Sequence, residues 1–502
     1  MNLILNAILI VGGIALLLLN PSILILVLLG NLAVSLFVLV VQFISSLLPN
    51  KYKERKRVSL KNAKFVSIHV PTYNEPPYIV KNTLKALSKL DYENYEVLVI
   101  DNNTKDKAIW QPVKEYCETL GPKFRFIHVD PLKGFKAGAL NYLMKRVNPQ
   151  TEFVAVIDAD YIVKPDFIKK ALQYFVDDKI GFVQFPQAFY NIGRGNLGVT
   201  LEYKHFFITY MNMSNYMGSL LTTGTLTVFR YDAIQDAGKF NTHALTEDAE
   251  IGLKLNLAGY QGVYVNDVVG EGLMPYDLDS YEKQKRRWSM GNAQIIKDNL
   301  FKILRTPIFN WKEKIAIFAQ LTAWLNFCLL PIFAIFTVGI MGLFTNISRM
   351  SYDIILIVSL TTLFTYVLFK LISFVLIFRK ENIGLISTLR AWLVHIGMQE
   401  VYSYALFLVL LSPNSEFIRT NKFLNMNSRS FPSGVVNEII LVTLSVVLAV
   451  HFYLVSDVIG FMAVTLAGIL FSLIFYVAFE FKYTKKYSKY AFERLNIKAD
   501  KL

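Results

Sequence analysis

The sequence predicts a doubly wound α/β domain, built on a mostly parallel sheet, that is inserted into a bundle of about six transmembrane helices. Three observations lead to this fold class. The chain of 502 residues is 54% hydrophobic and only 18% charged, whereas about a quarter of the residues of an ordinary soluble protein are charged. Its apolar runs are concentrated at the two ends. Between them, short β-branched runs alternate with helical stretches, a pattern typical of parallel sheets.

Residues 1–50 contain two apolar runs, Leu3–Leu19 and Ile23–Leu48, which are separated by Asn20-Pro21. Each run can cross a hydrocarbon core about 30 Å thick, which takes about 20 helical residues. A cleaved signal peptide is disfavoured because no basic residue precedes the first run and a second run follows at once. We therefore expect a pair of transmembrane helices.

Residues 301–480 contain the other four predicted spans, and a basic tail, 481–502, follows them. A fifth apolar segment, Gly384–Leu411, includes Arg390 and Glu400, and a charged residue at the centre of a bilayer costs about 2.5–3.5 kcal/mol. We therefore expect this segment to form interfacial helices that lie along the membrane surface and do not cross it. The four spans are predicted at 315–344, 354–378, 436–456 and 459–480.

Most of the net charge of +14 lies in two short stretches next to predicted spans. Residues 51–64 carry seven Lys/Arg and one Glu, and residues 481–502 carry seven Lys/Arg and two acids. Basic residues beside spans favour the cytoplasmic side and attract anionic lipids. The charge therefore predicts a lipid bilayer as partner and no nucleic acid. We expect a multi-pass protein of the plasma membrane, with the middle domain, 51–300, and both termini in the cytoplasm.

The middle domain shows the alternation of strands and helices most clearly. In doubly wound sheets, ligands bind beyond the carboxyl ends of the strands. Polar residues follow the first, second and fourth predicted strands, so we expect a site there. Strands are predicted at Phe65–Val70, Val97–Asp101, Phe124–Val129, Phe153–Asp158 and Gly181–Phe185, and helices at Lys81–Leu90, Lys136–Arg146 and Phe167–Phe175.

Two carboxylates, Asp158 and Asp160, end the fourth predicted strand. Side chains two residues apart on an extended chain point the same way, so both can face one ligand. A hydrated Mg²⁺ or Mn²⁺, held by one or two carboxylates and by substrate phosphates, fits such a pair. The alternative is a pair of turn-forming residues after a strand.

Thr246-Glu247-Asp248 precedes a helical stretch, Ala249–Leu257. Threonine is a good N-cap, and acids in the first turn complement the helix dipole, so the motif could simply begin the helix. The other interpretation makes Asp248 a general base that removes a proton from an attacking hydroxyl.

Gln284-Lys285-Arg286-Arg287-Trp288 precedes the third predicted span. Basic and aromatic residues at a membrane surface can serve as an anchor. Alternatively, Gln284 and Arg287, three residues apart on one helix face, bind diphosphate oxygens, and Trp288 offers a stacking face to a sugar.

Six motifs follow one another over about residues 65–300: Pro71–Glu75, Asp101–Asn103, Lys136–Asn141, Asp158–Asp160, Thr246–Asp248 and Gln284-x-x-Arg287-Trp288. In this order, they resemble the motifs of the family-2 inverting glycosyltransferases, and in particular of the membrane-embedded polysaccharide synthases such as bacterial cellulose synthase and hyaluronan synthase. Val183–Gln187 with Phe189–Asn191 is similar to a segment of the cellulose synthases. The segment Phe417–Lys422 is similar to their gating loop.

The resemblance implies a nucleotide-sugar domain of the GT-A type, with a mixed sheet, and a role for each matching residue. It implies Asp248 as the catalytic base and Asp160, together with Asp158, as the holder of Mg²⁺ or Mn²⁺. The implied UDP-binding residues are Tyr73, Glu75, Asp101, Lys136, Asp158, Gln284 and Arg287. The implied acceptor-binding residues are Trp288, Glu247, Gly224 and Thr225, and the gating loop, within 412–430, includes Phe417, Thr420 and Lys422.

The function implied is processive transfer of glucose from UDP-glucose to a growing polysaccharide, a β-glucan, which leaves through a channel between the transmembrane helices. Trp324, Trp392, Gln399, Glu400 and Tyr402 are candidates for the channel lining. Cellulose, mixed-linkage and 1,3-linked glucan remain open. The alternatives are a hyaluronan-like synthase, a non-processive transferase acting on a lipid carrier, and a non-catalytic nucleotide-binding membrane protein. Accessory subunits are not indicated by the sequence.

Overall fold

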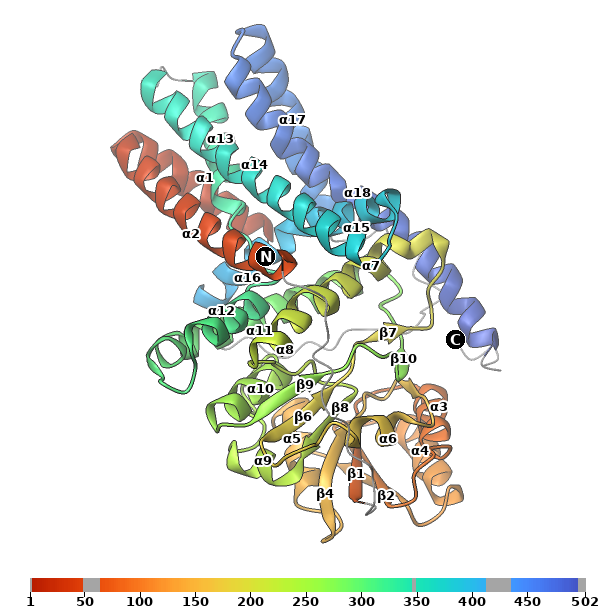
Figure 1. Ribbon diagram of the computed structural model, residues 1–502. Helices are drawn as coiled ribbons and strands as arrows, with labels where there is room; N and C mark the ends of the chain where they lie inside the picture. The colour runs from red at the N-terminus through yellow and green to blue at the C-terminus, as the bar shows by residue number, and fades with distance from the viewer. Residues whose placement is uncertain (1, 48–63, 345–348, 412–434, 495–502) are drawn as a thin grey trace.

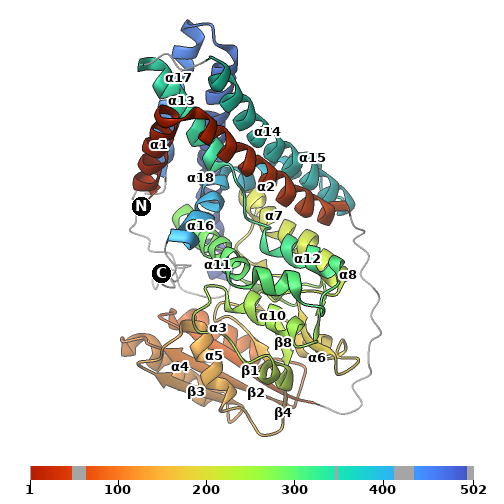
Figure 2. The same ribbon diagram turned by 90° about the vertical axis from the view of Figure 1, so that its left-hand side faces the viewer.

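The computed structural model describes residues 2–47, 64–344, 349–411 and 435–494. Apolar helices gather at one end of the molecule, an α/β domain forms the other, and further helices lie between the two (Figures 1 and 2). The α/β domain is where the sequence predicts it, because its apolar strands are buried together in a core of their own. The predicted gating loop, with Phe417, Thr420 and Lys422, lies outside the described residues.

The α/β domain is built on a seven-stranded sheet with the strand order β3-β2-β1-β4-β8-β6-β9. All neighbouring strands are parallel except β8, which is antiparallel to both β4 and β6. The prediction of a mostly parallel, doubly wound sheet is confirmed, and the sheet is mixed. The strands are β1 (Phe65–Thr72), β2 (Tyr95–Asn102), β3 (Phe124–Val129), β4 (Thr151–Val156), β6 (Ile180–Gln184), β8 (Thr227–Arg230) and β9 (Gln261–Tyr264).

Strand β4 ends two residues before the predicted end at Asp158. The reason lies in the backbone hydrogen bonds, because the N–H of Asp158 donates to Thr225 Oγ1 at 3.0 Å and its carbonyl accepts from Tyr161 N at 3.1 Å. Asp158 and Asp160 therefore lie in a turn. The turn leads to a small second sheet, of order β5-β10-β7, made of β5 (Ile162–Val163), β7 (Ala188–Phe189) and β10 (Gly270–Gly272).

The predicted helices of the domain are all present with shifted ends. The first begins four residues before Lys81, at Pro77, since proline is accommodated in the first turn of a helix. The helix Lys107–Thr119 and strands β8 and β9 were not predicted. The helices around the sheets are α3 (Pro77–Leu87), α4 (Lys107–Thr119), α5 (Phe135–Met144), α6 (Phe167–Leu172), α8 (Asn212–Met217), α9 (Tyr231–Asp236) and α10 (Glu247–Leu257).

A layer of helices lies between the sheet domain and the helical bundle (Figure 1). The segment predicted to be interfacial forms two helices of 13 residues that meet near Met398. Each is about 20 Å long, too short to cross a bilayer by itself. The layer comprises α7 (Leu197–Phe206), with the π-helical turn Phe207–Met211 after it, α11 (Leu278–Arg305), α12 (Trp311–Leu321), α15 (Leu385–Gly397) and α16 (Gln399–Leu411).

Within the described residues, four helices are long and apolar enough to cross a membrane, which indicates a membrane protein. They are α2 (Pro21–Leu47), α14 (Arg349–Lys380), α17 (Val435–Leu454) and α18 (Val458–Arg494), the last up to Ser488. Helices α1 (Asn2–Leu19) and α13 (Leu329–Phe344) are apolar but shorter.

The continuous span predicted at 315–344 is wrong, because the chain leaves the helix between Leu321 and Leu329. Side chains from distant helices bind the carbonyl groups of this break. Gln42 Nε2 donates to Thr322 O at 2.5 Å, and Lys370 Nζ donates to Ala323 O at 3.4 Å. Irregular backbone among membrane helices is stable where other protein groups form hydrogen bonds with its N–H and C=O groups, as they do here.

Candidate active site

The carboxyl ends of β1, β2 and β4 border an open cleft with about 1110 Å³ of empty space, open solvent included. The starts of α5 and α10 and the first half of α11 complete its walls. Ten predicted site residues meet at this cleft: Tyr73, Glu75, Lys136, Asp158, Asp160, Glu247, Asp248, Gln284, Arg287 and Trp288.

Asp101 is not among the residues that line the cleft. The residue is only 3% exposed, and its side chain accepts hydrogen bonds from Thr72 Oγ1 at 3.1 Å and Thr104 Oγ1 at 2.9 Å, while His128 Nδ1 lies 3.0 Å away. Burial raises the pKa of Asp101 above its usual value, against the lowering effect of these partners. The neighbouring Asn102 lines the cleft in its place.

Gly224 and Thr225 stand behind the carboxylates and do not line the cleft themselves, whereas Thr223 does. Thr225 is 1% exposed, and its hydroxyl accepts the hydrogen bond from Asp158 N described above. Gly224 has a φ of +86°, and a Cβ atom there would lie 2.9 Å from Asp248 Oδ2. The structure therefore places both residues where they set the positions of Asp158 and Asp248.

Replacement of Gly224 by alanine is expected to lower turnover by about 10-fold to 100-fold, since small displacements of a catalytic group have effects of this size. Gly238→Ala is the matched control, because Gly238 has a φ of +80° but no atom within 4 Å of the added Cβ. Both variants should lose about 1 kcal/mol of stability through the positive φ. Equal turnover rates of the two purified variants would contradict the close approach to Asp248.

The two carboxylates of the acidic turn face one cleft but have different partners. Lys136 Nζ donates to Asp158 Oδ1 at 2.5 Å, and Leu273 N donates to Asp160 Oδ2 at 2.9 Å. Within the described residues, no group of three or more His, Cys, Asp or Glu side chains could hold a metal ion. A carboxylate pair at an open cleft suits Mg²⁺ or Mn²⁺, whose remaining ligands come from water and phosphate.

Lys136 lies among several carboxylates. Its Nζ is 2.5 Å from Asp158 and 3.8 Å from Glu247 Oε1. Burial alone lowers the pKa of Lys136, but the charges of Asp158, Glu247 and Asp248 outweigh it and hold the pKa above its usual value. Lys136 is therefore a permanent cation in the cleft, able to receive a diphosphate.

The motif begins α10 as predicted, with Thr246 at the N-cap position and acids in the first turn, but the Thr246 side chain makes no capping hydrogen bond. The side chain packs instead against α11, where a Cβ on Gly291 would lie 2.3 Å from Thr246 Cγ2. Glu247 and Asp248 form the first turn of the helix and line the cleft. Burial raises the pKa values of both carboxyl groups, and the charge of Asp248 raises that of Glu247 further.

Turnover is expected to depend on pH through Asp248, because a base acts only when unprotonated. The raised pKa of Asp248 places the loss of activity at a higher pH than the value of about 4 at which an ordinary aspartate titrates. The measurement is kcat/KM for the donor from about pH 4 to about pH 9, because this ratio reports the pKa values of the free enzyme. An acidic limb centred at the usual aspartate value would contradict this environment for Asp248.

A second hollow continues from the cleft toward the bundle and shares Gln187, Thr223, Asp248 and Trp288 with it. Its far side is apolar, because Trp324 stacks on Phe206 with ring centroids 4.4 Å apart. The rings of Trp288 and Trp324 are 5.2 Å apart. Asp248 therefore stands at the junction of a polar cleft and an aromatic hollow.

The other four candidates for a channel lining do not line the cleft or the second hollow: Trp392, Gln399, Glu400 and Tyr402.

Phe135 lines the cleft although it was not predicted as a site residue. It is 43% exposed and has a φ of +50°. Non-glycine residues with positive φ are costly and gather at functional sites. The sequence feature that could have pointed to this strained position is Gly134, directly before Phe135, since glycine marks turns and loops.

The mixed sheet and its acidic cleft define a glycosyltransferase fold of the GT-A type. Residues 63–291, slightly less than half of the chain, match the family described as "Glycosyltransferase like family 2". This part of the chain is therefore similar to the family-2 glycosyltransferases.

Curated relatives include the probable glucomannan 4-beta-mannosyltransferase 3 of Oryza sativa subsp. japonica, which is 29% identical over 259 residues, 49% of this chain and 46% of the relative. Glucomannan 4-beta-mannosyltransferase 7 of Arabidopsis thaliana is 26% identical over 260 residues, with the same two shares. The chain thus matches about half the length of these relatives.

Among solved structures, the mannosyltransferase PcManGT from Pyrobaculum calidifontis in complex with GDP-Man and Mn²⁺ is similar with a TM-score of 0.54 and 17% sequence identity. The match covers 78% of this chain and 100% of that one. At this identity the similarity concerns the fold alone.

Proposed function

We propose that the protein is a processive, inverting glycosyltransferase that builds a β-glycan from a nucleotide sugar and secretes it between its own membrane helices. The observation that carries the proposal is the single cleft formed by Lys136, Asp158, Asp160 and Asp248, with Trp288 at its inner end. The curated relatives, whose names describe enzymes that make a β-linked polymer, support it.

The donor would bind over the strand ends, with its nucleoside near Tyr73 and Glu75. Lys136 and Arg287 would hold the diphosphate, since a point charge and a planar guanidinium both suit phosphate oxygens. Asp160 and Asp158 would hold Mg²⁺ or Mn²⁺, which when bound neutralises charge on the departing diphosphate.

The acceptor would lie in the second hollow, with its terminal sugar against Trp288. Asp248 belongs to both hollows, so it would take the proton of the acceptor hydroxyl as that oxygen attacks the anomeric carbon of the donor. One displacement of this kind inverts the anomeric carbon, and the bond to the diphosphate breaks as the glycosidic bond forms.

We propose mannose, from GDP-mannose, as the transferred sugar. The names of the curated relatives favour it over the glucose that the sequence resemblance implies. Glucose from UDP-glucose is the second candidate, because the segment Val183–Asn191 is similar to that of cellulose synthases.

The proposed orientation places the cleft in the cytoplasm, where nucleotide sugars are available. A polar polymer cannot cross hydrocarbon unaided, since each unpaired hydroxyl costs several kcal/mol there. The layer of α11, α12 and α16 connects the cleft to the bundle, so each added sugar would push the chain toward the membrane helices (Figure 2).

The test uses the purified protein in lipid nanodiscs with radiolabelled GDP-mannose or UDP-glucose and Mg²⁺ or Mn²⁺. Water-insoluble, high-molecular-weight product that a β-1,4-mannanase digests would support the proposal, and digestion by a cellulase or lichenase would assign the second candidate. A single sugar on extracted lipid would establish the lipid-carrier alternative instead. Nucleotide binding without sugar transfer from any donor would overturn the proposed function.

A further inference from the structure

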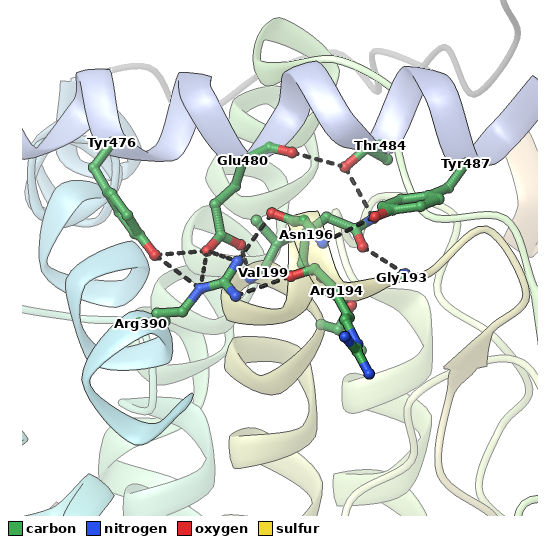
Figure 3. A network of polar contacts seen from close by, with 11 residues as sticks. Gly193, Arg194, Asn196, Val199, Arg390, Tyr476, Glu480, Thr484 and Tyr487 are labelled. Carbon is green, nitrogen blue, oxygen red and sulfur yellow. Dashed lines mark hydrogen bonds and ion pairs between the residues drawn. The ribbon is translucent and has the colours of Figure 1, made fainter. Parts of the chain in front are cut away.

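The last long helix, α18, continues beyond the bundle and runs along the segment that joins β7 to α7 (Figures 1 and 3). Glu480 of α18 is fully buried, and its Oε1 accepts from Arg390 Nη2 of α15 at 2.7 Å and from Tyr476 OH at 2.6 Å. Its Oε2 accepts from Val199 N of α7 at 2.9 Å. Three helices therefore meet at one carboxylate.

Farther along α18 the same face binds the segment before α7. Thr484 Oγ1 accepts from Asn196 Nδ2 at 3.1 Å, and Ser488 Oγ accepts from Asn191 Nδ2 at 3.0 Å. Residues four apart on a helix lie on one face, so Glu480, Thr484 and Ser488 form a continuous row.

Glycines make this close approach possible. A Cβ atom on Gly193 would lie 2.4 Å from the ring of Tyr487, and one on Gly195 would lie 2.3 Å from that of Tyr483. A Cβ on Gly198 would lie 2.5 Å from Glu480 Oε1. The docking of α18 is thus specified by the sequence of both partners.

Asn191 extends this contact to the acidic turn. It is fully buried, and its side chain pairs with the backbone of Met274, because Nδ2 donates to Met274 O at 2.9 Å and Met274 N donates to Oδ1 at 2.9 Å. The adjacent N–H, of Leu273, is the one that donates to Asp160 Oδ2. A short chain of hydrogen bonds therefore connects Ser488, Asn191, residues 273–274 and Asp160.

We propose that Asn191 is a positioning residue for Asp160, and that Ser488 fixes Asn191 to α18. The position of a membrane helix then sets the geometry of the carboxylate that is the candidate metal ligand. The inference rests on the proposed function, in which Asp160 holds a divalent ion. Groups that orient metal ligands typically change metal affinity by about 10-fold to 100-fold when removed.

The experiment measures Mn²⁺ binding by electron paramagnetic resonance, with GDP or UDP present, in the full-length protein. Asn191→Ala is expected to weaken Mn²⁺ binding by about 10-fold, and Ser488→Ala by less. Thr484→Val is the matched control, since Thr484 lies one turn away on the same face and its hydroxyl accepts from Asn196, which reaches only the backbone carbonyl of Asn191. Nucleotide affinity without metal should stay close to that of the wild type in all three variants.

Hydrogen exchange provides a readout that does not depend on metal. The amides of Leu273 and Met274 should exchange faster in Asn191→Ala than in the wild type, and at the wild-type rate in Thr484→Val. Unaltered exchange and Mn²⁺ affinity in Asn191→Ala would overturn the inference, as would an equal loss in Thr484→Val. If the wild type transferred no sugar, the proposed function would fail separately, and the exchange comparison would still decide whether Asn191 fixes this backbone.

Discussion

Asp248→Asn is expected to lower turnover by about 10³-fold, within the range of about 10²-fold to 10⁴-fold that general-base catalysis contributes. The amide keeps the shape of the side chain and the hydrogen bond that Asp248 Oδ1 accepts from Ala249 N, but it cannot take a proton. The loss should therefore fall on kcat, with the donor KM changed little. Steady-state measurement of nucleotide release over a range of donor concentrations gives both quantities.

The matched control is Asp232→Asn. Asp232 is also an acid in the first turn of a helix, α9, but it is exposed and does not line the cleft. It should leave turnover unchanged. If Asp248→Asn retained more than about a tenth of the wild-type rate, the base would be another group.

Lys285→Met is expected to be strongly destabilising, by about 3–5 kcal/mol, because it leaves a buried charge without its partner. Lys285 is fully buried, and its Nζ lies 2.6 Å from Glu202 Oε2. Tyr281 and Tyr402 also donate to the Glu202 carboxylate, at 2.8 Å and 3.1 Å. Burial alone would raise the pKa of Glu202, but Lys285 and His395 hold it well below its usual value.

Denaturation of the protein in detergent tests this prediction as a double-mutant cycle. Glu202→Gln combined with Lys285→Met removes both charges and should restore most of the lost stability. Lys283→Met, at an exposed position of the same helix, is the control and should have little effect. A double variant as unstable as Lys285→Met alone would contradict the interpretation of these residues as a mutually compensating pair.

The sheet and the acidic cleft could be predicted because both depend on local patterns. Strand β2, for example, is buried along its whole length, and its centre appears in the sequence as the apolar run Val97–Ile100. The carboxyl ends of parallel strands converge, so Tyr73 and Asp158 could be expected at one site although they are far apart in the chain.

The remaining features depend on contacts that no local pattern contains. The break after Leu321 lies in a run that includes Trp324 and Leu325, and the side chain that binds its first carbonyl, Gln42, is 280 residues away. Asn191 and its partner Ser488 are 297 residues apart. The inward direction of the Asp101 side chain likewise follows from hydroxyl groups on a neighbouring strand and loop.

The glycines at 193, 195 and 198 have the spacing Gly-x-Gly-x-x-Gly and open a helix, which in many proteins marks a dinucleotide site. In this chain the carboxylate of Glu480 occupies the position that a pyrophosphate would take. It accepts a hydrogen bond from the backbone N–H of Val199, the third residue of that helix. A search for this sequence motif alone would therefore assign a coenzyme pocket at a place where α7 packs against α18.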